Sequence, residues 1–224
     1  MSPLRIIPTG DGSHSLLNEE LQETYHSVHG AIRESAHVFI DHGLKHFVNQ
    51  FPEKKDVRIL EIGFGTGLNV LLTLQQSRTI SFTIRMESWE KFPLPPGIIA
   101  GLNHGDQLDQ AEAWKQIHEA PWGFETNLSS TFSIFKRKGD VVSDTITGVF
   151  DVIYYDAFAP SKQPELWSRE VLSKVIAQLN PGGVWVSYCA RGQVKRDLAS
   201  IGLKVETLPG PPGKKEMTRA IRAV

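Results

Sequence analysis

The chain has 224 residues, of which 40% are apolar and 22% are charged, and its net charge is −1. This composition is that of a globular protein and excludes a disordered or fibrous chain, while the near-neutral charge excludes a uniformly basic nucleic-acid binder. The length fits one domain better than two, so we treat residues 1–224 as a single domain.

Two further features indicate the compartment. The start of the chain, Met1 to Arg5, lacks the apolar stretch of a secretory signal, and no apolar run approaches the roughly 18 residues that span a bilayer. Cys189 is the only cysteine, so no internal disulfide can form, which suits a reducing compartment. We expect a cytoplasmic protein without a membrane partner.

Charge is unevenly distributed along the chain. Over residues 191–224, eight basic and three acidic residues give +5, which leaves −6 for the first 190 residues. Such an excess is typical of a phosphate-binding face and equally of a solvated surface, and both interpretations stay open.

The first 56 residues are expected to form an extension in front of the core, residues 57–224. Residues 4–7 and 15–17 flank a run of turn formers, residues 9–13, which predicts a hairpin. Residues 19–51 are predicted to be helical, because apolar side chains recur at helical spacing near their end. His42 and His46 lie one helical turn apart, but without a cysteine cluster or an HExxH pattern we expect solvent-facing histidines and no metal.

A glycine-rich turn follows the first core strand, which is predicted at residues 57–62. Gly63, Gly65 and Gly67 alternate with other residues before a predicted helix that begins near Leu68 and Asn69. Such glycines let the backbone turn sharply and approach a ligand closely. A dinucleotide fingerprint would place its third glycine at Leu68, so the pattern disfavours NAD. Glu61, just before the turn, favours a ligand with an ammonium group, and a purely structural turn is the alternative.

A carboxylate is expected at the end of the second strand, where apolar residues alternate with polar ones over residues 80–86. In such folds this carboxylate accepts hydrogen bonds from ribose hydroxyls. Glu90 is the first choice because it lies where the loop is expected to begin. Glu87 is the alternative, and either residue can instead be a solvated surface carboxylate.

The rest of the chain continues the alternation of strands and helices. Residues 93–127, rich in proline and tryptophan, are predicted to be an insertion, helical around residues 109–118. Further strands are predicted at residues 131–135, 150–156, 184–189, 204–208 and 218–224. The pattern predicts an α/β fold with a mostly parallel, doubly wound sheet.

Asp156 ends one of these strands and is followed by Ala157, Phe158 and a proline-stiffened turn. An alkyl amine like that of lysine has a pKa of about 10.4, and only its neutral form can attack a methyl sulfonium. Asp156 is therefore a candidate to orient an amine and accept its proton, with Phe158 stacking on a planar base. The alternative is an aspartate that caps the turn.

Several long motifs resemble one known family, in the same order. They are Gly63-Phe64-Gly65-Thr66-Gly67-Leu68-Asn69, Ser88-Trp89-Glu90-Lys91-Phe92-Pro93, Asp156-Ala157-Phe158-Ala159-Pro160 with Pro164-Glu165-Leu166-Trp167 and, towards the two ends, Asp11-Gly12-Ser13, Tyr25-His26-Ser27 with Glu34, and Gly213-Lys214-Lys215-Glu216-Met217. Over nearly the whole chain they resemble the methyltransferase domain of the MnmC family, stand-alone members included.

The resemblance implies a class I S-adenosylmethionine-dependent methyltransferase, Rossmann-like, with its last strand antiparallel. It implies methylation of the 5-aminomethyl group of 5-aminomethyl-2-thiouridine at the wobble position, in the anticodon loop of tRNA. The implied cofactor contacts are Glu61, Gly63, Phe64, Gly65, Gly67, Asn69 and Glu90, with Asp140 near adenine and Tyr25 and Glu34 closing the methionine end. Asp156 would face the amine, and the implied substrate contacts are Phe158, Pro160, Trp167, Tyr188, Lys214 and Lys215.

The chain departs from the family pattern at Ser187-Tyr188-Cys189, where Thr-Tyr-Ser is usual, and at Lys215, where arginine is usual. Bifunctional members add a flavin-dependent oxidase domain, for which this chain has no room. We therefore expect methylation without oxidation, and a separate flavin oxidase or aminomethyl-forming enzyme upstream. The alternatives are methyl or aminopropyl transfer to another amine, as in a spermidine synthase-type enzyme, and a non-catalytic RNA-binding subunit.

Overall fold

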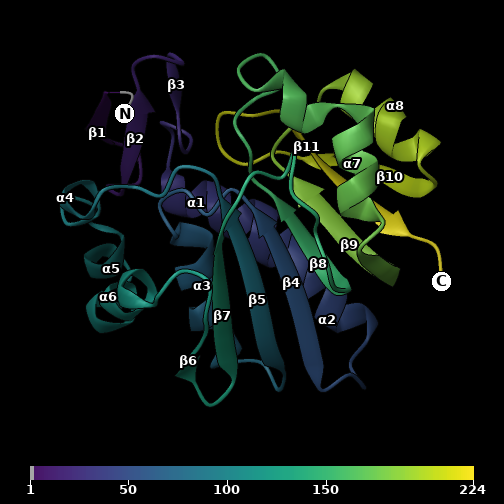
Figure 1. The fold of residues 1–224 in the computed structure, drawn as a ribbon, viewed down its shortest axis with the longest axis horizontal. Helices are drawn as coiled ribbons and strands as arrows, with labels where there is room; N and C mark the ends of the chain where they lie inside the picture. The colour runs from purple at the N-terminus through teal and green to yellow at the C-terminus, as the bar shows by residue number, and fades with distance from the viewer. Residues whose placement is uncertain (1–2) are drawn as a thin grey trace.

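A central mixed sheet organises the computed structural model, which describes residues 3–224 (Figure 1). Its strand order is β10-β11-β9-β8-β4-β5-β7-β6, and β7, β5, β4, β8 and β9 run parallel to their neighbours in that series. β11 is antiparallel to both β9 and β10, which confirms the predicted class I methyltransferase sheet with its last strand reversed. The strands are β4 (Asp56–Ile62), β5 (Thr83–Glu90), β6 (Glu125–Ser129), β7 (Phe132–Lys138), β8 (Phe150–Tyr155), β9 (Leu179–Ser187), β10 (Leu203–Pro209) and β11 (Glu216–Arg222).

Both faces of the sheet are buried, because consecutive residues of the central strands enter opposite halves of the core. Ile59 and Tyr154 belong to one apolar cluster, and their neighbours Leu60 and Tyr155 belong to the other. Near-continuous apolar strands are typical of a parallel sheet covered on both sides. The first cluster includes residues of the helices η1 (Ala36–Lys45), α2 (His46–Gln50), α3 (Leu68–Ser77) and α6 (Ala111–Glu119), and the second those of η2 (Pro164–Trp167), α7 (Arg169–Ile176) and α8 (Gly192–Ser200).

The N-terminal extension begins with the predicted hairpin, β1 (Leu4–Pro8) paired antiparallel with β2 (His14–Asn18). Residues 1 and 2 of the expected extension lie outside the described residues. The prediction of a helix from residue 19 was wrong for its first part, because β3 (Glu23–Thr24) pairs with β2. The Asn18 side chain accepts the backbone N–H groups of residues 20 and 21, which holds a turn there instead.

The hairpin turn fixes where the first helix starts. α1 (Ala31–Ser35) begins directly after Gly30, which has a φ of 146° and is the N-cap residue of this helix. Asp11 Oδ2 accepts the N–H of Arg33 at 3.0 Å, and Thr9 Oγ1 accepts that of Ala31 at 3.3 Å. The turn thus satisfies helix N–H groups that have no partner within the helix. α1 runs directly into η1, a π-helix, and then into α2.

The predicted insertion contains α4 (Pro96–Ile99), α5 (His104–Gln107) and α6, and α6 confirms the helix predicted around residues 109–118. The predicted end of the insertion, at residue 127, was wrong. Residues 125–129 form β6, which pairs antiparallel with β7 at the edge of the sheet. β6 lacks an apolar alternation, so its pairing partner rather than its own pattern makes it a strand. None of the helices in residues 3–224 reaches the length and hydrophobicity that a bilayer crossing requires.

Candidate functional site

A cavity of about 1450 Å³ opens at the carboxyl ends of β4, β5, β7 and β8. In an open α/β sheet, ligands bind at this edge. The segments that follow these four strands form its floor and walls, and residues 18–29 of the extension and the β10–β11 loop line it from the other side.

The floor is the glycine turn between β4 and α3. Gly63, Gly65 and Gly67 all have positive φ, and a Cβ at Gly63 would lie 2.5 Å from the carbonyl oxygen of Asp156. No other residue type fits there without moving the β8 end. Gly63, Phe64 and Gly65 line the cavity, whereas Gly67 packs outside it against Phe64.

Glu90 is the last residue of β5 and lies beside this turn. Its Oε2 accepts the Gly65 N–H at 3.0 Å, and its Oε1 accepts the Phe92 N–H at 2.8 Å. Burial raises the pKa of Glu90 above the ordinary value. Glu87 instead accepts hydrogen bonds from Trp89 and Arg137 and is not a lining residue. Of the two candidate carboxylates, Glu90 is the one in the cavity wall.

The wall next to Glu90 contains Asp140, in the loop after β7. Lys91 Nζ lies 2.8 Å from Asp140 Oδ2, and the Val142 N–H donates to Oδ1 at 2.9 Å. The hydrogen bond from Lys91 lowers the pKa of Asp140, so the two residues form an ion pair in this wall at neutral pH.

Two polar side chains at the floor have unused acceptors. Glu61 is fully buried, and although Ser88 Oγ donates to its Oε2, its Oε1 has no hydrogen-bond partner among the described residues. Burial raises the pKa of Glu61 to about 8. Asn69, a lining residue, donates to Asp156 Oδ2 at 2.9 Å, and its own Oδ1 lacks a partner in residues 3–224. Such buried acceptors are rare and mark a place where a donor is missing.

Asp156 directly follows β8 and lines the cavity together with Phe158. Burial, with the nearby Glu34 carboxylate, raises the pKa of Asp156 to about 7. The ring of Phe158 meets Tyr25 edge to face, with 4.9 Å between centroids. A carboxylate that titrates near neutrality thus lies beside an aromatic wall.

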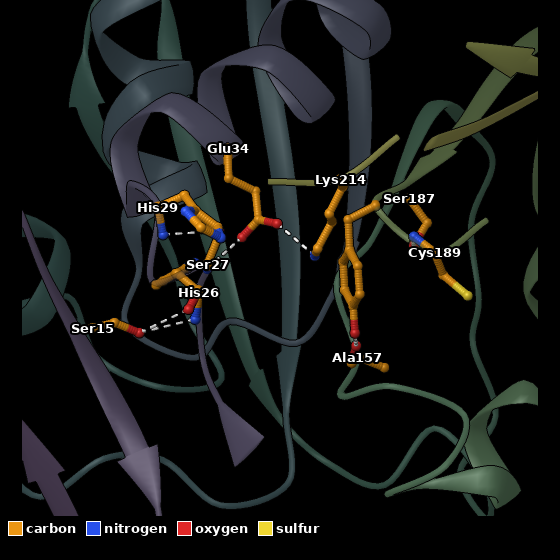
Figure 2. Close-up of polar contacts among 10 residues, drawn as sticks. Ser15, His26, Ser27, His29, Glu34, Ala157, Ser187, Cys189 and Lys214 are labelled. Carbon is orange, nitrogen blue, oxygen red and sulfur yellow. Dashed lines mark hydrogen bonds and ion pairs between the residues drawn. The ribbon is translucent and has the colours of Figure 1, made fainter. Parts of the chain in front are cut away.

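The opposite side brings together residues that are far apart in the sequence (Figure 2). Lys214 Nζ lies 2.6 Å from Glu34 Oε1, and the Ser27 N–H donates to Glu34 Oε2 at 2.7 Å. The same ammonium lies 3.8 Å from the ring centroid of Tyr188. Tyr188 directly follows β9, and the other three residues come from loops or from the short helix α1.

The structure therefore gathers most of the predicted site residues around one cavity. The lining set includes Tyr25, Glu34, Gly63, Phe64, Gly65, Asn69, Glu90, Asp140, Asp156, Phe158, Tyr188 and Lys214. The predicted residues that do not line it are Glu61, Gly67, Pro160, Trp167 and Lys215. Trp167 is buried and donates from Nε1 to the Phe158 carbonyl at 2.7 Å, so it supports the Phe158 loop from behind.

His42 and His46 are half-buried rather than solvent-facing, and the rings of His37 and His42 are 4.6 Å apart. Within residues 3–224, no group of three or more histidine, cysteine, aspartate or glutamate side chains is arranged to hold a metal ion.

Comparison with known proteins agrees with this geometry. Residues 127–223 match the model of a family described as S-adenosyl-L-methionine-dependent methyltransferase. Two curated relatives are the tRNA 5-methylaminomethyl-2-thiouridine biosynthesis bifunctional proteins MnmC of Cupriavidus necator and Pseudoalteromonas atlantica. The first is 31% identical over 88% of this chain and the second 30% identical over 90%. The chain spans about a third of their length, 31% of each.

A solved structure, MNMC2 from Aquifex aeolicus, covers 98% of this chain and 70% of its own, with 27% identity and a TM-score of 0.80. The chain is an MnmC methyltransferase-domain-like protein. Its cofactor is S-adenosylmethionine. The fold of this MnmC-like methyltransferase is also similar to that of spermidine synthase from Thermotoga maritima, at 13% identity over 98% of this chain and 69% of that one, with a TM-score of 0.53.

Two polar or aromatic examples, His26 and Phe92, illustrate the lining residues of the MnmC-like methyltransferase that were not singled out from the sequence. His26 is buried, its Nε2 lies 2.7 Å from Thr66 Oγ1, and burial lowers its pKa to about 4. Phe92 is 68% exposed although it lines the cavity, so it offers a bare ring beside Glu90. Both residues belong to motifs that resemble the MnmC family, and this resemblance was the feature of the sequence that could have identified them.

Proposed function

We propose that this methyltransferase methylates the 5-aminomethyl group of 5-aminomethyl-2-thiouridine at the wobble position of tRNA, giving 5-methylaminomethyl-2-thiouridine. The observation that carries the proposal is Asp156, a half-buried carboxylate with a pKa of about 7 in the same cavity as the glycine turn. The names of the MnmC relatives, which concern biosynthesis of this nucleoside, support the choice of substrate.

The lining residues fit S-adenosylmethionine, which supplies a methyl group on a sulfonium. The turn at Gly63 and Gly65 leaves room for a ligand where side chains would project, and Phe64 lies between them. In this proposal Glu90 accepts hydrogen bonds from the ribose hydroxyls, and Asp140 accepts one from the adenine amine; both residues line the cavity. The unused acceptor of Asn69, a lining residue, suits the methionine ammonium. Tyr25, whose ring would lie 3.3 Å from a Cβ added at Gly65, closes that end.

Asp156 has the properties that an amine acceptor requires. At pH 7 an alkyl amine with a pKa of about 10.4 needs about 4 to 5 kcal/mol to lose its proton, at 1.36 kcal/mol per pKa unit. A carboxylate with a pKa of about 7 holds the ammonium form and takes its proton more readily than an ordinary aspartate. Phe158 provides a face on which the base stacks, and the Pro160 turn with Trp167 keeps that face in place.

The proposal includes the partners and the place of the reaction. The chain acts as one methyltransferase domain on the anticodon loop of tRNA, with Lys215 on the exposed side of the β10–β11 loop facing the phosphates. The aminomethyl substrate comes from a flavin oxidase activity or from an enzyme that forms the aminomethyl group directly. Because tRNA is the substrate, we propose a cytoplasmic location.

The test is incubation with labelled S-adenosylmethionine and tRNA that carries 5-aminomethyl-2-thiouridine, followed by nucleoside analysis. We expect label in 5-methylaminomethyl-2-thiouridine and none with tRNA that has unmodified uridine there. Parallel incubation with decarboxylated cofactor and polyamine acceptors distinguishes aminopropyl transfer. Cofactor binding without methylation of any tRNA would instead indicate a non-catalytic RNA-binding subunit.

A further inference from the structure

The β10–β11 loop brings one lysine into the cavity and leaves its neighbour outside. Gly213 has a φ of 85°, which favours glycine, and it packs against the His29 ring, so that a Cβ there would require this ring to move. The next residue, Lys214, is a lining residue of the cavity, whereas Lys215 is exposed. The two lysines are adjacent in the sequence but have different surroundings.

The surroundings of the Lys214 ammonium are those of a binding site for an alkylammonium ion. Its Nζ lies 2.6 Å from a carboxylate oxygen of Glu34 and 3.8 Å from the ring centroid of Tyr188. An aromatic face combined with a carboxylate is a common way to recognise an organic cation. The Tyr188 hydroxyl donates to the Ala157 carbonyl at 2.8 Å, so this ring is fixed next to Asp156.

In this ion pair the Glu34 carboxylate is held rigidly, whereas the Lys214 ammonium is not. The Glu34 side chain is 7% exposed, and its second oxygen accepts the Ser27 N–H. α1, which carries Glu34, is in turn fixed by the side chains of the hairpin turn. Lys214 instead reaches the site on a long flexible stem and stays 34% exposed. Another cation can therefore replace the lysine without rebuilding the site.

We propose that Glu34, Tyr188 and Asp156 form a seat for a primary alkylammonium group, and that Lys214 fills this seat until the amine of the substrate displaces it. The inference rests on the proposed function, because it identifies the displacing cation with the acceptor amine. It moves Glu34 from the methionine end of the cofactor to the acceptor side. The seat also gives specificity, since a neutral substituent on the base leaves the Glu34 carboxylate paired with Lys214.

Binding measurements with S-adenosylhomocysteine present test the seat without turnover. The compared ligands are one tRNA with 5-aminomethyluridine and the same tRNA with 5-hydroxymethyluridine, so that phosphate contacts cancel in the ratio of the two dissociation constants. Lys214→Met should increase the preference for the aminomethyl tRNA about tenfold, because the resident cation is gone. Glu34→Gln should abolish the preference, and the matched control Lys215→Met should leave the ratio unchanged.

If the ratio of the two dissociation constants is the same in Lys214→Met, in Glu34→Gln and in the wild type, the proposed seat is refuted. Equal weakening of both tRNAs in Lys214→Met would show that Lys214 binds phosphate instead. If the wild type also methylates the tRNA, the proposed function survives that result. A second measurement does not depend on tRNA. The ¹⁵Nζ signal of Lys214 should shift on titration with ethylammonium chloride but not with sodium chloride of equal ionic strength. No difference between the two salts refutes the displacement even if the proposed function fails.

Discussion

Replacing Asp156 by asparagine tests two properties of this residue separately: its role as a proton acceptor, and the destabilisation of the fold that its ionisation causes. The Asp156→Asn variant keeps the size of the side chain and an oxygen that can accept the 2.9 Å hydrogen bond from Asn69, but its amide cannot take a proton. We expect methyl transfer to fall by about 10² to 10⁴-fold, the usual contribution of a positioned proton acceptor. The affinity for S-adenosylmethionine should change little, because the proposed cofactor contacts lie on the glycine turn and on Glu90.

The same substitution should stabilise the protein above neutral pH. The pKa of Asp156 is about 7 in the fold, compared with an ordinary value of 3.8. At 1.36 kcal/mol per pKa unit, ionising it in place costs up to about 4 kcal/mol. Between pH 4 and 7 the folded state keeps a proton that the unfolded state releases, so this contribution to stability is lost as pH rises. Asparagine does not ionise, so the Asp156→Asn variant does not lose this stability as pH rises.

Thermal melts at pH 4.5 and pH 8 measure this effect. We expect the variant to gain about 2 to 4 kcal/mol over the wild type at pH 8, roughly 5 to 10 °C in Tm, and little at pH 4.5. In the wild type, kcat/KM should also rise as pH increases through about 7. A variant with a near-normal rate, or one less stable than the wild type at pH 8, would refute the reasoning about Asp156.

Three further substitutions test the framework around the cavity. Glu90→Gln should weaken S-adenosylmethionine binding at least tenfold in calorimetry, and the control Glu87→Gln, outside the cavity, should not; equal effects would remove Glu90 from the cofactor site. Gly63→Ala should abolish cofactor binding, since its Cβ would lie 2.5 Å from a backbone oxygen, whereas Gly97→Ala meets nothing within 4 Å and should bind normally. Asp11→Ala should cost about 1 to 2 kcal/mol of unfolding free energy in denaturant titrations, because α1 loses its cap; an unchanged midpoint would contradict this role.

The parts of the site that sequence predicts are those set by local chemistry. The glycine turn and Asp156 directly follow strands, and Glu90 ends one. Because the carboxyl ends of parallel strands share one edge, their proximity follows from the order of elements. Residues 19–30 were mispredicted as helix, because the Asn18 side chain and the pairing of β3 act against a weak helical pattern.

The pairing of Glu34 with Lys214 could not be predicted, since no pattern joins residues 180 positions apart. Only the three-dimensional path of the chain brings α1 to the β10–β11 loop. The same holds for β6, which is a strand because β7 offers an unpaired edge. Long-range pairing thus decided these features, which the sequence left undetermined.

The place of β11 has a consequence for how the enzyme matures. This strand is inserted between β9 and β10, which precede it in the chain, and the loop that leads into it carries Lys214. A growing polypeptide that still lacks residues 210–222 already contains the glycine turn, but it lacks the strand between β9 and β10 and also lacks Lys214. Catalytic competence should therefore arise in one step, when this strand has left the ribosome, rather than by degrees as the preceding strands are made.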